Sequence, residues 1–385
     1  MRVLYISTGY GPHDHRFLSA LSKTSHKVHF LRLARFERQT EDRPVPPGIE
    51  QLEWAGGRRA FRWRDIPRLL RDLRRVIKDV QPDLIHAGPI QTCAFLAVLS
   101  GFRPVLTMSW GFDLMQDADR DPWWNWATRY TLRRSSFFVS DARVTQAKAV
   151  SLGMPANRTA VFPWGVDLEH FKPGASARSK SRLLAPRKGT KTRGTPSGKT
   201  VARPFVLFCN RSWEPRYGVD VLAKAFVLAA RQHEGLSLIL LGGGSQANAI
   251  RRILLDAGKM DRVQLGGLVT QGALPSWYQM ADLFVSPSHV DGSSVSLMEA
   301  LACGTPVLVS DIPANKEWVR DNVNGWLFRD GDTEDLAERI LWISTQRAIL
   351  PRISRAARKV AEARADWNKN FQVLLRSYKR AVTAP

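Results

Sequence analysis

Ser286-Pro-Ser-His-Val-Asp-Gly-Ser-Ser-Val-Ser-Leu-Met-Glu-Ala-Leu-Ala-Cys-Gly-Thr-Pro306 is the stretch of sequence that decides the fold. A buried strand is predicted over Asp282–Ser286, and a helix is predicted over 294–302 after the Gly/Ser-rich turn. A strand, a tight turn and a helix in succession are the repeating unit of a parallel α/β sheet. The free N–H groups of the turn and of the helix start predict an anion site.

The same alternation extends from this stretch in both directions. In the C-terminal half, strands are predicted at Phe205–Cys209, Leu236–Leu241, Val263–Leu265, Asp282–Ser286 and Pro306–Ser310. Helices are predicted between and after them, at 219–233, 246–257, 272–280, 294–302 and 332–343. In the N-terminal half, strands are predicted at Arg2–Ser7, Lys27–Leu31, Asp83–His86, Pro104–Ser109, Ser136–Ser140 and Thr159–Phe162. Two doubly wound α/β units in tandem account for this pattern.

The segment between the two sets of strands has a different composition. Gly174–Arg203 is rich in Ser, Thr, Gly, Pro, Lys and Arg, and its only large apolar residues are Leu183 and Leu184. Such a segment buries too little surface to offset its ordering entropy, so we predict a flexible basic linker. The predicted organisation is a first domain at 1–173, the linker at 174–203, a second domain at 204–365 and a C-terminal helix at 366–385 that crosses back to the first domain.

The positive charge of the chain is concentrated in three places. The 385 residues include 57 Lys and Arg against 35 Asp and Glu, for a net charge of +22. Residues 58–78, 174–203 and 347–380 have balances of +7, +9 and +8, so the remainder is nearly neutral. A uniformly basic nucleic-acid binder is not expected from this distribution.

The three cysteines, Cys93, Cys209 and Cys303, lie in apolar stretches and indicate buried thiols in a reducing compartment.

Location is predicted from the apolar runs and from one basic helix. The run at Met1–Ser7 is too short for a signal peptide, and 92–101 is about half the ~20 residues of a membrane span. The helix predicted at 64–80 has an apolar stripe and a basic remainder, and Phe61 and Trp63 precede it. We expect a cytoplasmic protein that contacts the anionic inner face of the plasma membrane peripherally. A solvated helix packed on the first sheet is the alternative.

Candidate ligand-binding residues follow the predicted strands. Asp291 precedes the Gly/Ser turn and Glu299 lies in the helix, where one carboxylate could meet a sugar and the other ribose hydroxyls. The alternative is an N-cap acid and a solvated glutamate. Arg211 follows the strand at 205–209, where its forked guanidinium would suit a diphosphate; an isolated surface arginine is the alternative.

Two glycine-rich turns are weaker indications. Leu241-Gly-Gly-Gly-Ser245, which contains Gly243, would allow the backbone to approach a nucleotide, although the dinucleotide fingerprint is absent. Gly9 and Gly11 follow the first strand in a similar way and could line the site from the other side. His15 and Arg16 follow this second turn, with loop or capping roles as the alternative.

The motif from Asp291 to Pro306 strongly resembles the nucleotide-sugar motif of retaining family-4 glycosyltransferases. Phe162–Pro173, Asn210–Asp220 and Asn324–Phe328 resemble further motifs of that family in the same order, and the resemblance covers 1–173 and 204–382. It implies an α/β protein of GT-B fold, with two Rossmann-like doubly wound domains facing across a cleft. It also implies sugar transfer with retention from a UDP- or GDP-sugar to a saccharide or lipid-linked acceptor, in bacterial surface polysaccharide, lipopolysaccharide or glycolipid biosynthesis. No metal or cofactor is expected.

The resemblance also implies residue roles. Asp291 stands where the family has its first Glu, which contacts the donor sugar, and Glu299 matches the second, which binds ribose. Arg211 matches the diphosphate-binding arginine, so Asp291 and Arg211 are the expected catalytic residues. The amides expected to hold sugar and phosphate are those of Gly292, Ser293, Ser294 and Val295.

This sequence departs from the family pattern in two places. Asp291 is one methylene shorter than Glu, and Tyr217 occupies the position of a phosphate-binding lysine, next to Arg216. On the acceptor side, Trp110-Gly-Phe-Asp113 resembles a motif of the first domain, and His86 ends a strand that is expected to point into the same cleft. The expected acceptor-side residues are therefore His15, Arg16, His86, Trp110 and Asp113.

Two other functions remain open at this level. One is an epimerase-like enzyme of the same fold that acts on a nucleotide sugar. The other is a non-catalytic protein that binds nucleotide sugars or polyanions, suggested by Tyr217 and by the basic linker.

Overall fold

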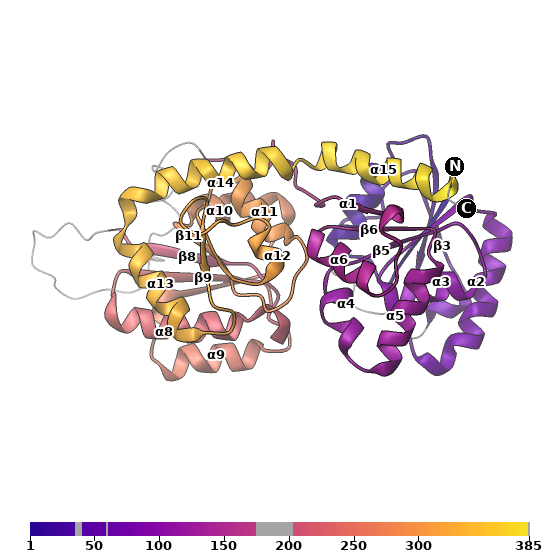
Figure 1. Ribbon diagram of the computed structural model, residues 1–385. Coiled ribbons are helices and arrows are strands. Elements are labelled where there is room, and N and C mark those ends of the chain that lie inside the picture. The colour runs from indigo at the N-terminus through magenta and orange to yellow at the C-terminus, as the bar shows by residue number, and fades with distance from the viewer. Residues whose placement is uncertain (35–40, 59–60, 175–202, 384–385) are drawn as a thin grey trace, which may run out of the picture. The chain divides into compact units, whose positions relative to one another are not determined.

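The computed structural model describes residues 1–34, 41–58, 61–174 and 203–383. The chain forms two compact units (Figure 1): Met1–Trp164 together with Asn368–Pro385, and Gly165–Trp367. The segment predicted to be a flexible linker lies outside the described residues over 175–202. Of the helices in the described ranges, none is both long enough and apolar enough to span a bilayer.

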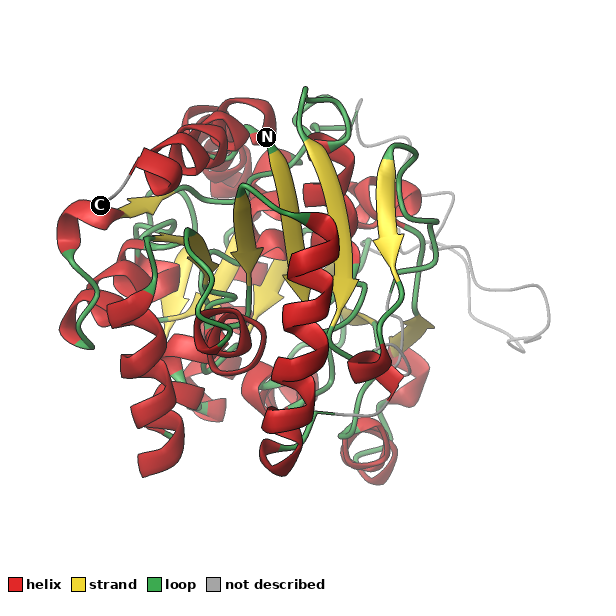
Figure 2. Ribbon diagram, turned by 90° about the vertical axis from the view of Figure 1, so that its right-hand side faces the viewer, coloured by secondary structure: helices red, strands yellow, loops and turns green. Residues whose placement is uncertain are grey.

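The first unit contains a seven-stranded parallel sheet with the order β3-β2-β1-β4-β5-β6-β7. Its strands are β1 (Arg2–Ser7), β2 (Lys27–Arg32), β3 (Ile49–Leu52), β4 (Leu84–Ala87), β5 (Val105–Met108), β6 (Phe137–Ser140) and β7 (Thr159–Val161). Its main helices are α1 (Pro12–Leu21), α2 (Ile66–Val80), α3 (Phe95–Leu99), α4 (Phe112–Met115), α5 (Pro122–Arg134), α6 (Arg143–Ser151) and α15 (Trp367–Thr383). Figure 2 shows strands of this sheet side by side with helices around them.

Side chains alternate between the two faces of the sheet along each strand, and in a parallel sheet helices cover both faces. Both faces of this sheet are therefore buried. Leu4 and Ile85 belong to one core cluster that includes residues of α2 and α3. Tyr5 and His86 point to the opposite face, where the His86 ring packs edge-on against Tyr5 and against Tyr378 of α15. The continuous apolar character of the central strands follows from this double burial.

The second unit contains a six-stranded parallel sheet with the order β10-β9-β8-β11-β12-β13. Its strands are β8 (Phe205–Cys209), β9 (Leu236–Leu241), β10 (Val263–Gly267), β11 (Leu283–Ser286), β12 (Val307–Ser310) and β13 (Trp326–Phe328). Its main helices are α8 (Val219–Gln232), α9 (Ala247–Asp256), α10 (Leu274–Met280), α11 (Val295–Ala302), α12 (Pro313–Lys316), α13 (Thr333–Thr345) and α14 (Leu350–Arg364). One core cluster joins the sheet to α8, α9 and α13, and another joins it to α10, α11 and α14 (Figure 1).

The α/β fold class predicted from the sequence is confirmed by these two parallel sheets with flanking helices. Two edge strands, β3 and β13, were not predicted. β3 has only two apolar residues and is partly exposed, and β13 is three residues long, so neither shows a strong apolar pattern. Edge strands form through pairing with a neighbour, which local sequence does not report.

The structure groups 165–173 with the second unit, whereas the sequence predicts a first domain that ends at 173. The backbone N–H of Val166 donates to Ala365 O over 2.7 Å, and Phe171 is buried in a core cluster of the second unit. At the other end, α15 joins the first unit from Asn368 onward. There the Asn370 side chain donates to Pro163 O over 2.8 Å.

Candidate active site

The strand order of the second unit reverses direction between β8 and β11. β8 pairs with β9 on one side and with β11 on the other, so the loops after β8 and β11 diverge at this point. In doubly wound sheets, ligands bind outside the carboxyl ends of the strands at such a switch point. Arg211 comes from the loop after β8 and Asp291 from the loop after β11, and Arg211 Nη2 donates to Asp291 Oδ2 over 2.6 Å.

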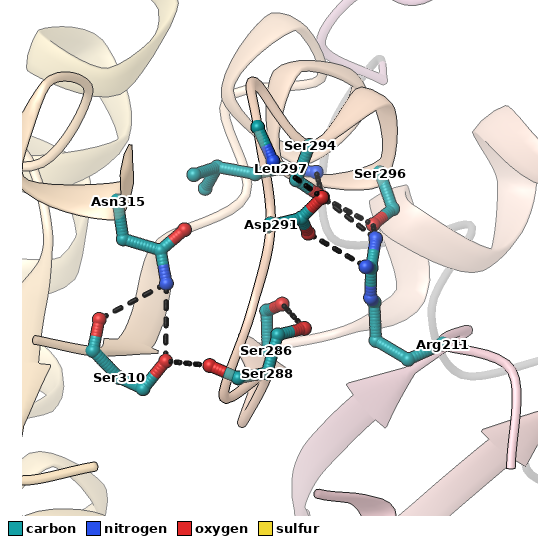
Figure 3. Close-up of polar contacts among 10 residues, drawn as sticks. Arg211, Ser286, Ser288, Asp291, Ser294, Ser296, Leu297, Ser310 and Asn315 are labelled. Atoms are coloured by element: carbon teal, nitrogen blue, oxygen red, sulfur yellow. Dashed lines mark hydrogen bonds and ion pairs between the residues drawn. The ribbon is translucent and has the colours of Figure 1, made fainter. Parts of the chain in front are cut away.

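The Arg211 guanidinium is held on several sides (Figure 3). Its Nη1 donates to Ser294 Oγ over 2.8 Å and to Ser296 Oγ over 3.0 Å. The guanidinium carbon lies 4.3 Å from the centroid of the Tyr217 ring, within the range of a cation–π contact. Its Nε is buried and has no hydrogen-bond partner among the described residues. The group is therefore rigidly oriented.

Arg211 and Asp291 form a largely desolvated ion pair, with side chains 11% and 16% exposed. Burial acts to lower the pKa of Arg211, but attraction to Asp291 and to further acidic groups around it together outweighs burial, and the net shift is upward. Burial raises the pKa of Asp291, and the Arg211 guanidinium opposes that shift. The attraction at 2.6 Å favours the charged form of both groups. An anionic ligand would meet a positive group whose position is already set.

The loop that contains Asp291 leads directly into the N-terminus of α11. Ser294 is the N-cap, and its Oγ accepts from the Leu297 N–H over 3.4 Å (Figure 3). Gly292 is buried and donates its N–H to Asp291 Oδ1 over 3.1 Å. Ser293 Oγ accepts from Trp318 Nε1 over 3.0 Å, and Val295 is half-buried at the first position of the helix. The helix start and its flanking amides favour an anion there.

A buried network fixes the start of this loop. The Asn315 side chain donates to Ser310 O over 3.0 Å and to Ser310 Oγ over 3.1 Å (Figure 3). Ser310 Oγ in turn donates to Ser288 O over 2.5 Å. The ends of β11 and β12 are therefore tied together beneath the loop, which preorganises the site. No sequence signal identified Asn315 or Ser310, because neither belongs to a recognisable pattern.

Glu299 is held in the same region by side chains from other elements. It is 3% exposed, and its carboxylate accepts from Tyr278 Oη over 2.8 Å and from Gln271 Nε2 over 2.9 Å. Asn210, the neighbour of Arg211, donates through Nδ2 to Tyr278 Oη over 2.8 Å. Burial raises the pKa of Tyr278 well above its usual range, so its hydroxyl remains a donor. Sequence reasoning missed Gln271 and Tyr278, which precede the motif on a separate helix segment.

The glycine-rich turn after β9 packs against the loop after β8. Gly243 O accepts from the Trp213 N–H over 3.0 Å, and a side chain at Gly243 would meet open space. A Cβ at Gly244 would lie 2.5 Å from Trp213 O, so glycine is needed there for the two backbones to approach. Arg216, half-buried, accepts from the His289 N–H through its backbone O over 2.9 Å. This places Arg216 and Gly243 around the same loop as Arg211.

Gly218 connects this loop to α8, and we expect its replacement by alanine to destabilise the second unit. Its φ is +59°, and a Cβ would lie 2.2 Å from Pro287 O in the loop after β11. Gly258 has a similar φ of +62° but open space around it. Gly258→Ala should cost about 1 kcal/mol from backbone strain alone, and Gly218→Ala at least about 3 kcal/mol because the clash adds to it. Thermal denaturation measures both; equal losses would contradict the close contact.

In the first unit, the residues after β1 are tied to one another. Gly11 donates its N–H to Asp14 Oδ2 over 2.9 Å, and His15 Nδ1 lies 2.8 Å from Tyr10 Oη. A Cβ at Gly9 would meet open space, so the turn is free of side chains at that position. Arg16 is half-buried on α1. These positions form the capped start of α1.

His86 and Asp113 have positions that differ from those expected of side chains at the sheet edge. His86 is fully buried, its Nδ1 lies 2.7 Å from Tyr378 Oη, and burial lowers its pKa to about 3. Asp113 accepts from Ser109 Oγ over 2.6 Å and from the Ile90 N–H over 3.1 Å, and burial raises its pKa to about 6. Both side chains hold elements of the first unit together. The Trp110 ring packs edge-on at 5.1 Å from Trp164.

The comparisons with known proteins agree with this architecture. The family model "Glycosyltransferase Family 4" matches residues 9–170, and "Glycosyl transferases group 1" matches 195–360. A D-inositol 3-phosphate glycosyltransferase of Saccharomonospora viridis is 31% identical over 233 residues, which are 57% of this chain and 49% of that protein. The match thus spans about half the length of that relative.

Two further similarities extend over more of the chain. A GDP-mannose-dependent alpha-(1-6)-phosphatidylinositol monomannoside mannosyltransferase of Mycobacterium tuberculosis is 26% identical over 77% of this chain and 75% of its own. The structure of Anabaena HepE in complex with UDP-glucose superposes with a TM-score of 0.76 at 19% identity, covering 98% of this chain and 99% of that one. At that identity the superposition establishes the fold. The superposition shows the GT-B fold. The two family models, which match residues 9–170 and 195–360, show that the chain belongs to the family-4 glycosyltransferases.

Proposed function

We propose that the protein transfers a sugar from a nucleotide diphosphate sugar to a saccharide or lipid-linked acceptor, with retention of the anomeric configuration. The observation that supports this most directly is the oriented Arg211 guanidinium beside the N-terminus of α11, at the switch point of the second sheet. A preformed cationic site of this kind is suited to a diphosphate that becomes more negative as the sugar departs. Family membership supplies the reaction class.

In the proposed mechanism, the developing charge on the leaving diphosphate is stabilised by Arg211 and by the amides around Gly292 and Val295. Arg216, on the adjoining turn, adds positive charge. Asp291 would contact the donor sugar, and the acceptor hydroxyl would attack from the face that the diphosphate leaves. Retention and independence from metal ions are the parts of this proposal that rest on the family resemblance.

The donor is proposed to be a UDP- or GDP-sugar. The mycobacterial relative is named for GDP-mannose, and HepE is complexed with UDP-glucose, so both nucleotides occur among similar proteins. Glu299 would bind the ribose hydroxyls, as the family resemblance implies, because a carboxylate oxygen accepts hydrogen bonds from hydroxyl groups. The acceptor is proposed to be lipid-linked, because the mycobacterial relative is named for a phosphatidylinositol mannoside. The setting would be bacterial surface polysaccharide or glycolipid assembly at the inner membrane face.

A calorimetric screen of UDP- and GDP-sugars against the full chain tests this function. We expect one donor to bind and to release its nucleoside diphosphate when a membrane lipid extract is added, with the labelled sugar recovered in the lipid fraction. Conversion of the donor to its epimer without transfer would indicate the epimerase-like alternative. Tight donor binding with neither transfer nor conversion would indicate a non-catalytic binding protein and contradict the proposal.

A further inference from the structure

A group of exposed and half-buried aromatic rings lies on the first unit. We call it the tryptophan surface and define it as Trp63, Trp123, Trp124, Trp126 and Tyr130. Trp123 is 62% exposed and Trp126 is 44% exposed. Exposed indoles that lie together in one patch mark an interaction surface more often than isolated ones do.

The spacing along α5 produces this surface. Trp123, Trp126 and Tyr130 recur at helical spacing, while Ala127, Thr131 and other residues of the opposite side are buried. The Trp123 and Trp126 rings lie 5.0 Å apart, and Trp126 lies 5.3 Å from Tyr130. The three rings thus contact one another along one side of α5, and Trp126 and Tyr130 also pack edge-on against the buried Phe95.

Trp63, at the start of α2, extends the surface towards that helix. Its ring is stacked parallel to that of Trp123 at 6.3 Å and lies edge-on to Trp124 at 6.0 Å. Between the two helices, α3 packs against both α2 and α5 (Figure 1). The tryptophan surface is therefore continuous with the start of α2, the basic helix predicted at 64–80.

The flanks of the surface are positively charged. The Arg120 guanidinium lies 4.9 Å from the Trp124 ring, and that of Arg134 lies 4.2 Å from the Tyr130 ring. Exposed basic residues continue along α2: Arg64, Arg71, Arg74, Arg75 and Lys78. None of these seven groups forms an ion pair with a carboxylate in the part of the chain that the structure describes. Their charge is available to an anionic partner.

We propose that the tryptophan surface docks onto an anionic lipid bilayer, with the indoles of Trp123 and Trp126 at headgroup level and the arginines of α2 on anionic headgroups. Indole combines an apolar face with an N–H donor, which suits the boundary between headgroups and acyl chains. Basic side chains near such a boundary add attraction to anionic lipid. A second copy of the chain would oppose one positive surface to another, so charge complementarity favours the membrane. This proposal does not depend on the proposed transferase reaction.

Co-sedimentation of the full chain with vesicles tests the proposal. Vesicles of phosphatidylcholine mixed with phosphatidylglycerol should bind the protein, and vesicles of phosphatidylcholine alone should bind it much less. Trp123→Ala/Trp126→Ala should weaken binding about ten-fold or more at both low and high salt, because the lost contribution is apolar. Trp342→Ala is the matched control, because Trp342 is 45% exposed on the second unit. It should bind like the unaltered chain.

A charge reversal separates the electrostatic contribution. Arg64→Glu/Arg71→Glu should weaken binding at least ten-fold at low salt and much less at high salt, since each basic residue contributes about five-fold. Arg355→Glu/Lys359→Glu makes the same change in charge on exposed positions of α14 and should have little effect. All the altered side chains are exposed, and circular dichroism verifies that each variant remains folded.

Two outcomes would overturn the proposal. One is unchanged vesicle binding by the Trp123/Trp126 variant, and the other is an equal loss in the Trp342 control. If the Trp123/Trp126 variant keeps vesicle binding but loses self-association in sedimentation velocity, the surface would be assigned to a second copy. If it instead loses binding to a single-stranded RNA, the surface would be assigned to nucleic acid.

Discussion

Replacing Arg211 with alanine should lower kcat for sugar transfer by about 10²–10³-fold, the range seen when one preorganised donor to a developing oxyanion is removed. Arg211 is oriented by Asp291, Ser294 and Ser296 before any ligand binds, so its interaction with the leaving group requires little reorganisation. Because the charge grows as the bond breaks, the effect should appear in kcat more than in the donor KM. Steady-state kinetics with a labelled donor measures both constants.

Arg211→Ala also breaks the ion pair with Asp291, so a loss of activity could come from lost stability. Arg211→Lys separates the two effects. Arg211→Ala leaves Asp291 without its cation in a largely buried site, which costs about 3–5 kcal/mol of stability. Arg211→Lys keeps a positive charge near Asp291 but loses the fork that contacts both serines. It should fold normally and still lose at least about ten-fold in kcat. Arg231→Ala, on the exposed side of α8, is the matched control. Normal kcat in Arg211→Lys would argue against a direct role for the fork.

Replacing Glu299 with glutamine should raise the donor KM by about 100-fold and change kcat comparatively little. Glu299 is proposed to bind ribose hydroxyls, which are remote from the bond that breaks, so its interaction is made equally in the ground state and the transition state. Losing two hydrogen bonds to a charged acceptor accounts for a change of this size. The carboxamide keeps the volume and can still accept from Tyr278. Calorimetry with the identified donor gives the change in affinity directly.

Two further variants test whether the loss of donor affinity in Glu299→Gln comes from the position of this carboxylate. Tyr278→Phe removes a donor that holds the carboxylate, and it should give a smaller loss of about ten-fold in donor affinity. Glu338→Gln makes the same chemical change at an exposed position of α13 and should have no effect. If Glu299→Gln bound the donor as tightly as the unaltered chain, the assignment of Glu299 to the ribose would be wrong.

Much of the fold was predictable because its elements have strong local signals. The buried strands β1, β8 and β9 are continuous apolar runs that end in turn residues, and the structure places them where the sequence predicts. The helices predicted for the second unit agree with α8, α9, α10, α11 and α13 within a few residues, since their apolar periodicity is clear. Edge strand β3 and the assignment of 165–173 to the second unit were not predictable, because both depend on contacts with distant segments.

The sequence by itself determined the residue types that the candidate site contains: Arg211 after one strand, Asp291 after another, and Glu299 on the helix that follows. Their chemical types and their positions at strand ends are local properties, and parallel strands bring such ends to one edge. Only the tertiary structure decided how these groups are held. The Arg211–Asp291 ion pair, the anchoring of Glu299 by Tyr278 and the burial of His86 beneath Tyr378 join segments far apart in the chain. Such contacts arise from packing, which no local pattern of residues specifies.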